Sequence, residues 1–201
     1  EVKICDLRKE LREGNKTIFS RILAEAIKDR LEKREQVMLF LIRRGYAGFI
    51  SCRSCGYVFR CPHCDVSPTS HRNGQLVCHY CGLSVPMPDR CPSCGSPYIA
   101  GFGLGTQKVE TMVKKYFPSA RTLRMDMDST SRKDSHGKIL SSFAKGEADI
   151  LIGTQMIAKG HDYPNVTLVG IMAADLSLNA DSFTAAETGF RLMLQAAGRA
   201  G

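Results

Sequence analysis

Short apolar runs alternate with amphipathic stretches along both ends of the chain. QVMLFLI (36–42), DILIG (149–153) and VTLVGIMAA (166–174) are almost uninterrupted, which is typical of strands buried on both faces. RTLRM (121–125) and VKICDL (2–7) also favour strands. Apolar residues recur at helical spacing in four further stretches: 17–35, 109–117, 136–146 and 181–198.

Strands that alternate with helices predict an α/β fold, with a parallel sheet covered by helices on both faces. VKICDL would be the first strand, and Thr17 would cap the long helix that follows it. The Gly-, Pro- and Ser-rich middle of the chain interrupts this alternation after the second predicted strand. We therefore expect residues 1–51 and 95–201 to form one α/β domain, with residues 52–94 inserted in it.

Four CxxC pairs lie within the insert: C52RSC55, C61PHC64, C78HYC81 and C91PSC94. Paired CxxC spacing in a chain without a signal peptide indicates metal rather than disulfides. Glycine follows three of these cysteines, where a tight turn around a metal requires positive φ. Eight thiolates suffice for two tetrahedral zinc sites.

An Asn-Gly hairpin signal separates the second pair from the third, which favours a nested arrangement. The inner site would then contain Cys61, Cys64, Cys78 and Cys81. The outer site would contain Cys52, Cys55, Cys91 and Cys94. A cross-braced arrangement, ligation by His63, His71 or His79 in place of a cysteine, and rubredoxin-like iron binding are the alternatives.

The formal charge of +8 overstates the case for nucleic-acid binding. If eight thiolates surround two divalent ions, the charge of the chain falls to about +4 and that of the insert to about −2. Contacts of the insert with DNA would then depend on a few placed arginines: Arg53, Arg60, Arg72 and Arg90.

Candidate phosphate-binding and motor motifs lie in the last hundred residues. The sequence contains no G-x-x-x-x-G-K-[ST] loop, and GFGLGT (101–106) favours an ordinary loop before a helix. Polar residues follow the C-terminal end of a buried strand in the stretch ILIGTQMIAKGHDYPNV (150–166). Parallel sheets bind ligands at this end of their strands.

GTQMIAKGHDYPNV and QAAGRAG (195–201) resemble motifs V and VI of superfamily 2 helicases. LFLIRRGYAGFISCRSCGYVFRCPHC (39–64), with the CxxC pairs after it, resembles the PriA family of primosomal replication-restart helicases. That family usually has Asn where this chain has Ile42. The resemblance implies the second RecA-like lobe of a 3′-to-5′ DNA helicase, with an inserted double zinc-ribbon module.

The resemblance also implies roles for individual residues. Thr154, Gln155 and Lys159 would contact single-stranded DNA or couple to it. Gly160, Asp162, Gln195 and Arg199 would face the nucleotide, and Gln195 and Arg199 would act on the phosphates of ATP, since a guanidinium stabilises phosphoryl charge. ATP and Mg²⁺ would be bound mainly by a first lobe of a longer chain, so we expect this chain alone to be inactive as an ATPase.

The partners that the resemblance implies are forked or single-stranded DNA, primosome and single-strand-binding proteins, and the first helicase lobe. We expect a cytoplasmic location, because the sequence contains neither a signal peptide nor an apolar run long enough to span a membrane. The alternative functions are a stand-alone zinc-ribbon module that binds nucleic acid or protein, and a rubredoxin-like electron carrier.

Overall fold

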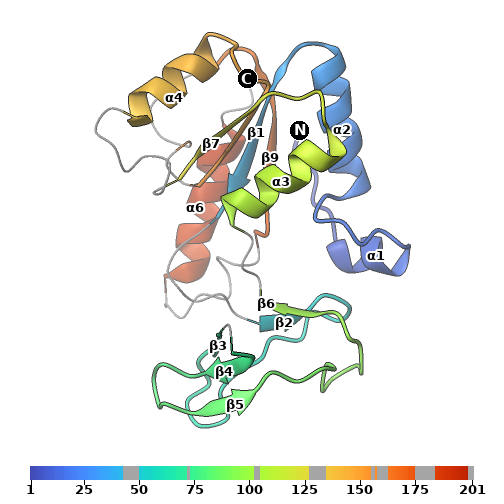
Figure 1. The fold of residues 1–201 in the computed structure, drawn as a ribbon, viewed down its shortest axis with the longest axis vertical. Coiled ribbons are helices and arrows are strands. Elements are labelled where there is room, and N and C mark those ends of the chain that lie inside the picture. Colours follow the sequence, from blue (N-terminus) through green and yellow to red (C-terminus); the bar gives the residue numbers. More distant parts are fainter. Residues whose placement is uncertain are drawn as a thin grey trace.

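The computed structural model shows a larger α/β lobe and a smaller, cysteine-rich module (Figure 1). It describes these residues: 1–42, 50–71, 73–101, 105–126, 135–154, 157, 163–174 and 184–198. Within these ranges, none of the helices has both the length and the apolar character that a membrane span requires.

The lobe is built on a four-stranded sheet in the order β7-β8-β1-β9, and every neighbouring pair is parallel. This confirms the predicted α/β fold with a parallel sheet. Leu39 in the middle of β1 pairs with Ile152 of β8 on one side and with Gly170 of β9 on the other. The strands are β1 (Gln36–Leu41), β7 (Thr122–Met125), β8 (Ile150–Gly153) and β9 (Val166–Met172).

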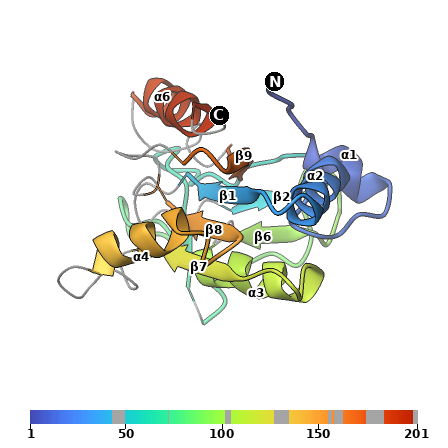
Figure 2. The same ribbon diagram turned by 90° about the horizontal axis from the view of Figure 1, so that it is seen from above.

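Helices cover both faces of this sheet because its central strands are apolar on both sides (Figure 2). Alternate side chains of β1 enter two different cores. Leu39 packs with α2 and α3, whereas Phe40 packs with α4 and α6, as does Ile42 directly after the strand. The helices are α2 (Arg21–Glu32), α3 (Thr106–Tyr116), α4 (Ser135–Ala144) and α6 (Ala185–Ala197).

The N-terminal segment differs from the prediction of a strand over VKICDL. Residues 1–6 form no strand, and a short helix, α1 (Leu7–Arg12), follows them. Asp6 caps α1, accepting a hydrogen bond from the backbone N–H of Arg8 at 2.8 Å. β1 is therefore the first strand of the described sheet, and the module follows the first strand rather than the second.

The prediction that Thr17 caps the long helix is also wrong. α2 begins at Arg21, and its cap is Ser20, whose hydroxyl accepts a hydrogen bond from the N–H of Leu23 at 3.2 Å. The hydroxyl of Thr17 instead donates a hydrogen bond within the loop, to the carbonyl oxygen of Phe19 at 2.7 Å. Ser and Thr hydroxyls serve loops and caps alike, so the sequence alone did not decide between the two residues.

The module begins and ends with an antiparallel pair of strands, in which Ile50 pairs with Gly101 and Cys52 with Ile99. Strand pairing therefore carries the module beyond the predicted boundary at residue 94. A three-stranded sheet lies within it. The predicted hairpin is present, with Gly74 in the turn between its two strands. The strands are β2 (Ile50–Cys52), β3 (Thr69–Ser70), β4 (Gln75–Val77), β5 (Ser84–Pro86) and β6 (Ile99–Gly101).

Candidate functional site

The four CxxC segments of the module fold in the same way. In each, the backbone N–H of the residue after the second cysteine donates to the carbonyl of the first cysteine, at 2.8–2.9 Å. The donor residue has positive φ in every case: Gly56 (84°), Asp65 (55°), Gly82 (78°) and Gly95 (70°). The glycines meet the predicted need for positive φ, and Asp65 is one of the few residue types that tolerate it.

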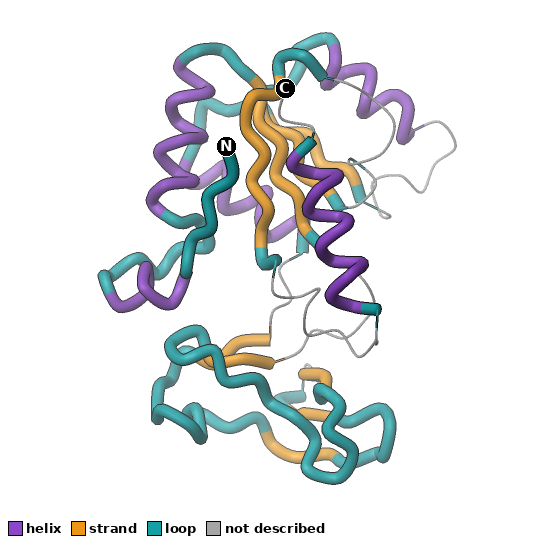
Figure 3. Tube along the Cα trace, turned by 180° about the vertical axis from the view of Figure 1, so that it is seen from behind, coloured by secondary structure: helices purple, strands orange, loops and turns teal. Residues whose placement is uncertain are grey.

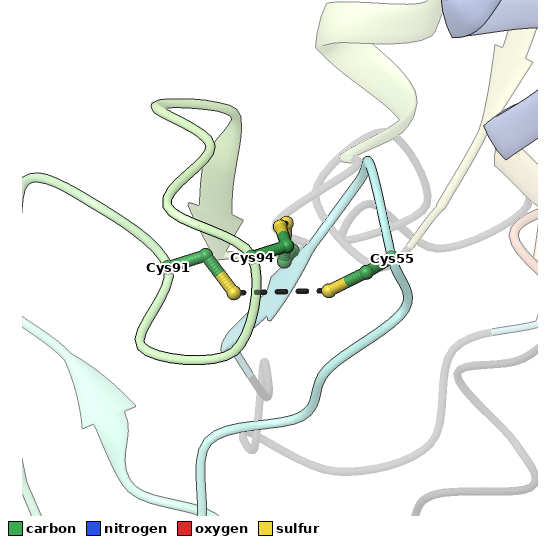
Figure 4. Close-up of side chains that lie close together, drawn as sticks. Cys55, Cys91 and Cys94 are labelled. Carbon is green, nitrogen blue, oxygen red and sulfur yellow. Dashed lines mark hydrogen bonds between the residues drawn. The ribbon is translucent and has the colours of Figure 1, made fainter.

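These segments bring the eight cysteines together in the nested arrangement. Cys52, Cys55, Cys91 and Cys94 form one group and Cys61, Cys64, Cys78 and Cys81 the other; within each, all four sulfur atoms lie within 4.8 Å of one another. Figure 4 labels three members of the outer group, Cys55, Cys91 and Cys94; the sulfurs of Cys55 and Cys91 are 3.7 Å apart. The sulfurs of Cys64 and Cys78 in the inner group are 3.4 Å apart.

These distances fit a tetrahedral zinc ion. A Zn–S bond of ~2.3 Å places the sulfurs of a regular tetrahedron about 3.8 Å apart. The closest approaches in the two groups, 3.4–3.7 Å, are slightly shorter and need little adjustment. Both groups therefore have the ligand type, number and geometry of a structural four-cysteine zinc site.

The local electrostatics favour a thiolate at one cysteine of each group, whereas burial raises the pKa of Cys64 in the inner group and of Cys94 in the outer group. Burial opposes the ionisation of Cys52, but hydrogen bonds from the backbone N–H groups of Cys55 and Ser54 outweigh it, and its pKa falls to about 7. In the inner group, the backbone N–H of Cys81 is the main cause that lowers the pKa of Cys78 to about 6, against the effect of burial. Each group thus contains a thiol that readily loses its proton to a metal.

Three of the four arginines considered for DNA contacts instead bind backbone carbonyls, and Arg72 lies outside the described residues. Arg60 donates to the carbonyl of Asp65 at 2.9 Å, and Arg90 donates to that of Gly95 at 3.1 Å. Each arginine precedes the first cysteine of its segment and binds the residue after the second. These two arginines brace the turns that surround the metal groups.

Arg53 joins the module to the lobe. Its guanidinium donates to three consecutive carbonyls of the α1–α2 loop: Lys16 at 2.8 Å, Asn15 at 3.2 Å and Thr17 at 2.6 Å. Lys16 in turn places its ammonium 5.8 Å from the ring centre of Tyr98 in the module. This contact was missed by sequence reasoning, because nothing in the sequence pairs a CxxC arginine with a loop more than thirty residues earlier.

The C-terminal edge of the lobe sheet carries the stretch that resembles motif V. β8 ends at Gly153, and a Cβ atom there would lie 2.6 Å from Cγ2 of Ile157 and 2.8 Å from the carbonyl oxygen of Met125. Only glycine fits this close approach of two strand ends. Thr154 follows, half-buried, at the edge where β1 also ends before the module begins.

A buried polar cluster at the same edge was also missed. Asp126 directly follows β7 and accepts hydrogen bonds from the hydroxyl of Thr106, the first residue of α3, and from the guanidinium of Arg124, the latter at 2.6 Å. Asp126 is 6% exposed and Thr106 is 3% exposed. Since a carboxylate already lies at the start of α3, this helix start is less suited to bind a phosphate.

Of the remaining predicted residues, Gln195 is exposed near the end of α6. The other predicted DNA- and nucleotide-facing residues lie outside the described residues: Gln155, Lys159, Gly160, Asp162 and Arg199. The structure therefore positions the start of the stretch that resembles motif V, and the helix in which the stretch that resembles motif VI begins.

Two family models match the chain. The model of the PriA DNA helicase Cys-rich region (CRR) domain matches residues 61–86, which contain the whole inner cysteine group. The model of the helicase conserved C-terminal domain matches residues 101–201, about half of the chain. The chain belongs to the helicase C-terminal domain family. In this helicase domain, the stretches resembling motifs V and VI lie inside the matched range.

The helicase domain and its module together are homologous to PriA over the whole chain. The chain is 55% identical over 202 residues to the replication restart protein PriA of Bacillus subtilis (strain 168), covering 100% of this chain and 25% of that protein. Identity to the replication restart protein PriA of Synechocystis sp. is 49% over 205 residues, with the same coverage. The chain thus spans about a quarter of the length of these relatives.

Proposed function

We propose that this chain is the zinc-bearing second motor lobe of an ATP-dependent 3′-to-5′ DNA helicase that acts in replication restart and primosome assembly. The observation that carries this proposal is topological. β1 and β8 are parallel neighbours, so the zinc module that follows β1 and the motif V stretch that follows β8 begin at the same edge of the sheet. DNA held at that edge would lie within reach of both.

Single-stranded DNA is the proposed ligand of the first part of motif V. The Thr154 hydroxyl, the Gln155 amide and the Lys159 ammonium are groups that bind phosphate oxygens and sugars. The fit of Gly153 against the end of β7 supports this assignment, because it fixes the point at which the stretch leaves the sheet.

ATP with Mg²⁺ is the proposed ligand of the second set of residues. Gly160 and Asp162 would line the nucleotide cleft, and Gln195 and Arg199 would reach the phosphates that another lobe binds. The exposure of Gln195 on α6 supports a surface that closes against such a lobe. Because the sequence contains no Walker-type phosphate loop, the chain alone should not hydrolyse ATP.

Each four-cysteine group is proposed to hold one Zn²⁺ that maintains the fold of the module. The module would then engage forked DNA, primosome proteins or single-strand-binding proteins. Its charge of about −2 with zinc bound argues for specific contacts rather than general attraction to DNA.

Arg199→Ala in the full-length protein tests the motor role. Loss of an arginine that stabilises the transferring phosphoryl group should lower kcat for DNA-stimulated ATP hydrolysis by roughly 10³-fold or more, measured by phosphate release. The matched control, Arg191→Ala, changes an exposed arginine of α6, eight residues earlier in the sequence, and should leave kcat unchanged.

Two results would contradict the proposal. One is ATP hydrolysis by the isolated chain. The other is full activity of the Arg199→Ala protein, which would favour the alternative of a zinc-ribbon binding module without a motor role. Iron rather than zinc in the purified chain would favour the electron-carrier alternative.

A further inference from the structure

Two exposed histidines of the module face each other outside both cysteine groups. His71 follows β3, and His79 lies inside the third CxxC segment. Their Nε2 atoms are 3.2 Å apart, the ring centres are 5.2 Å apart, and the rings are inclined by 54°. The pair therefore presents two imidazole nitrogens to one point in space.

Both histidines are attached to backbone whose conformation is fixed. The N–H of His71 donates to the carbonyl of Gln75 at 2.9 Å and the carbonyl of His71 accepts from Gly74 at 3.1 Å, which closes the hairpin. His79 lies in the turn that the N–H of Gly82 closes on the carbonyl of Cys78, at 2.8 Å. The short strand β4 joins the two positions, so bringing the rings together costs little further ordering.

The separation of the two nitrogens fits coordination of one metal ion. With Zn–N bonds of about 2.0–2.1 Å, two ligands of a tetrahedral ion have nitrogens about 3.3–3.4 Å apart, and adjacent ligands of an octahedral ion about 2.9 Å. The observed 3.2 Å lies between these values. A metal ion at this point would replace the proton that the two nitrogens can share in its absence.

The geometry points to a third metal site, at which His71 and His79 bind one divalent transition-metal ion. Imidazole nitrogen suits Zn²⁺, Ni²⁺ and Cu²⁺. The eight cysteines already complete two four-ligand groups, so the histidines are not needed there. With two protein ligands, both exposed, the site keeps open positions for water or an oxygen anion, and its ion exchanges more readily than the ions of the cysteine groups.

A bound ion would also change the local charge. The module carries about −2 when both cysteine groups hold zinc, and a further divalent ion would neutralise it. Tyr80, the residue after His79, is 82% exposed. The site would thereby make this end of the module more favourable for anionic ligands.

The test measures zinc content at several buffered concentrations of free zinc, by equilibrium dialysis and elemental analysis of the zinc-loaded chain. The unchanged chain should bind one ion more than His71→Gln or His79→Gln at the higher concentrations. His63→Gln is the matched control, because His63 is exposed within another CxxC segment, and it should keep the extra ion.

Equal zinc content in all four proteins at every concentration would overturn the inference, as would an extra ion that persists in the double variant His71→Gln/His79→Gln. At low free zinc, all proteins should retain the ions of the cysteine groups, which shows that the variants are folded. If all four proteins contained fewer than two zinc ions at low free zinc, the proposed zinc sites of the cysteine groups would be contradicted. The histidine site is tested only by the difference in zinc content between the variants.

Discussion

The lobe and the module differ in how much apolar surface they bury. In the lobe, every side chain of β1 and β8 is buried, and two cores form on opposite faces of the sheet. In the module, strands are two or three residues long and loops predominate (Figure 3). Among its described residues, the core consists of three buried side chains, Ile50, Phe59 and Leu76, with Met87 and Ile99 partly buried against them.

This difference shows that the two regions depend on different interactions. Burial of one large apolar side chain contributes about 1.5–3 kcal/mol, so three such side chains cannot offset the conformational entropy of a module of about fifty residues. Structural zinc sites contribute roughly 10–16 kcal/mol in small zinc-dependent peptides. We therefore expect the metal to determine the fold of the module, and the apolar cores to determine that of the lobe.

The two regions meet at a small polar contact. Arg53 binds the carbonyls of the α1–α2 loop, and Arg8 of α1 lies against Gly56, whose hypothetical Cβ would be 3.4 Å from the Arg8 guanidinium. Among the described residues, no apolar cluster contains side chains from both regions. Each region should consequently respond separately when the other is perturbed.

Cys61→Ser should have the largest effect and should act on the module alone. Loss of one inner ligand should reduce the zinc held by the cysteine groups from two ions to one and unfold the inner hairpin, because the remaining core is too small to hold it. Elemental analysis and amide hydrogen exchange over residues 58–90 would measure both changes. Cys5→Ser is the control, since Cys5 belongs to neither group. A parallel loss of helical circular dichroism would contradict the separation of the two regions.

Gly153→Ala should have a smaller effect, and on the lobe alone. The added methyl would meet the Met125 carbonyl and Ile157, so the free energy of unfolding should fall by about 1–3 kcal/mol in urea denaturation. Gly137→Ala in α4 meets no atom within 4 Å and should be neutral or raise stability by up to about 1 kcal/mol. The idea fails if both variants behave alike or if zinc content falls.

Arg53→Ala should have the smallest effect and should act on the contact between the regions. Loss of the hydrogen bonds to the α1–α2 loop should destabilise that loop by about 0.5–1.5 kcal/mol, seen as faster amide exchange over residues 8–19. Zinc content should stay unchanged. Arg60→Ala removes an exposed contact within the module and should leave exchange in the loop as it was. Unaltered exchange in Arg53→Ala would show that the contact does not couple the regions.

The sequence predicted those features that depend on local pattern. Uninterrupted apolar runs identified the central strands, since a strand buried on both faces has no polar side. CxxC spacing and the Asn-Gly turn identified both cysteine groups. The pattern failed at VKICDL, where alternation suggested a strand but Asp6 starts a helix, and the apolar Val2 and Ile4 remain exposed.

The tertiary structure alone decided the contacts between residues distant in the chain. Asp126 meets Thr106 only because β7 ends beside the start of α3, and His71 faces His79 only because a hairpin returns the chain to the third CxxC segment. From the sequence alone, Arg53 could equally have faced solvent or DNA. In the folded chain its guanidinium binds the α1–α2 loop. Local periodicity and ligand spacing are properties of short stretches and can be read from sequence. Long-range polar contacts can be identified only in the folded chain, because each polar side chain could form hydrogen bonds equally well with several other groups or with solvent.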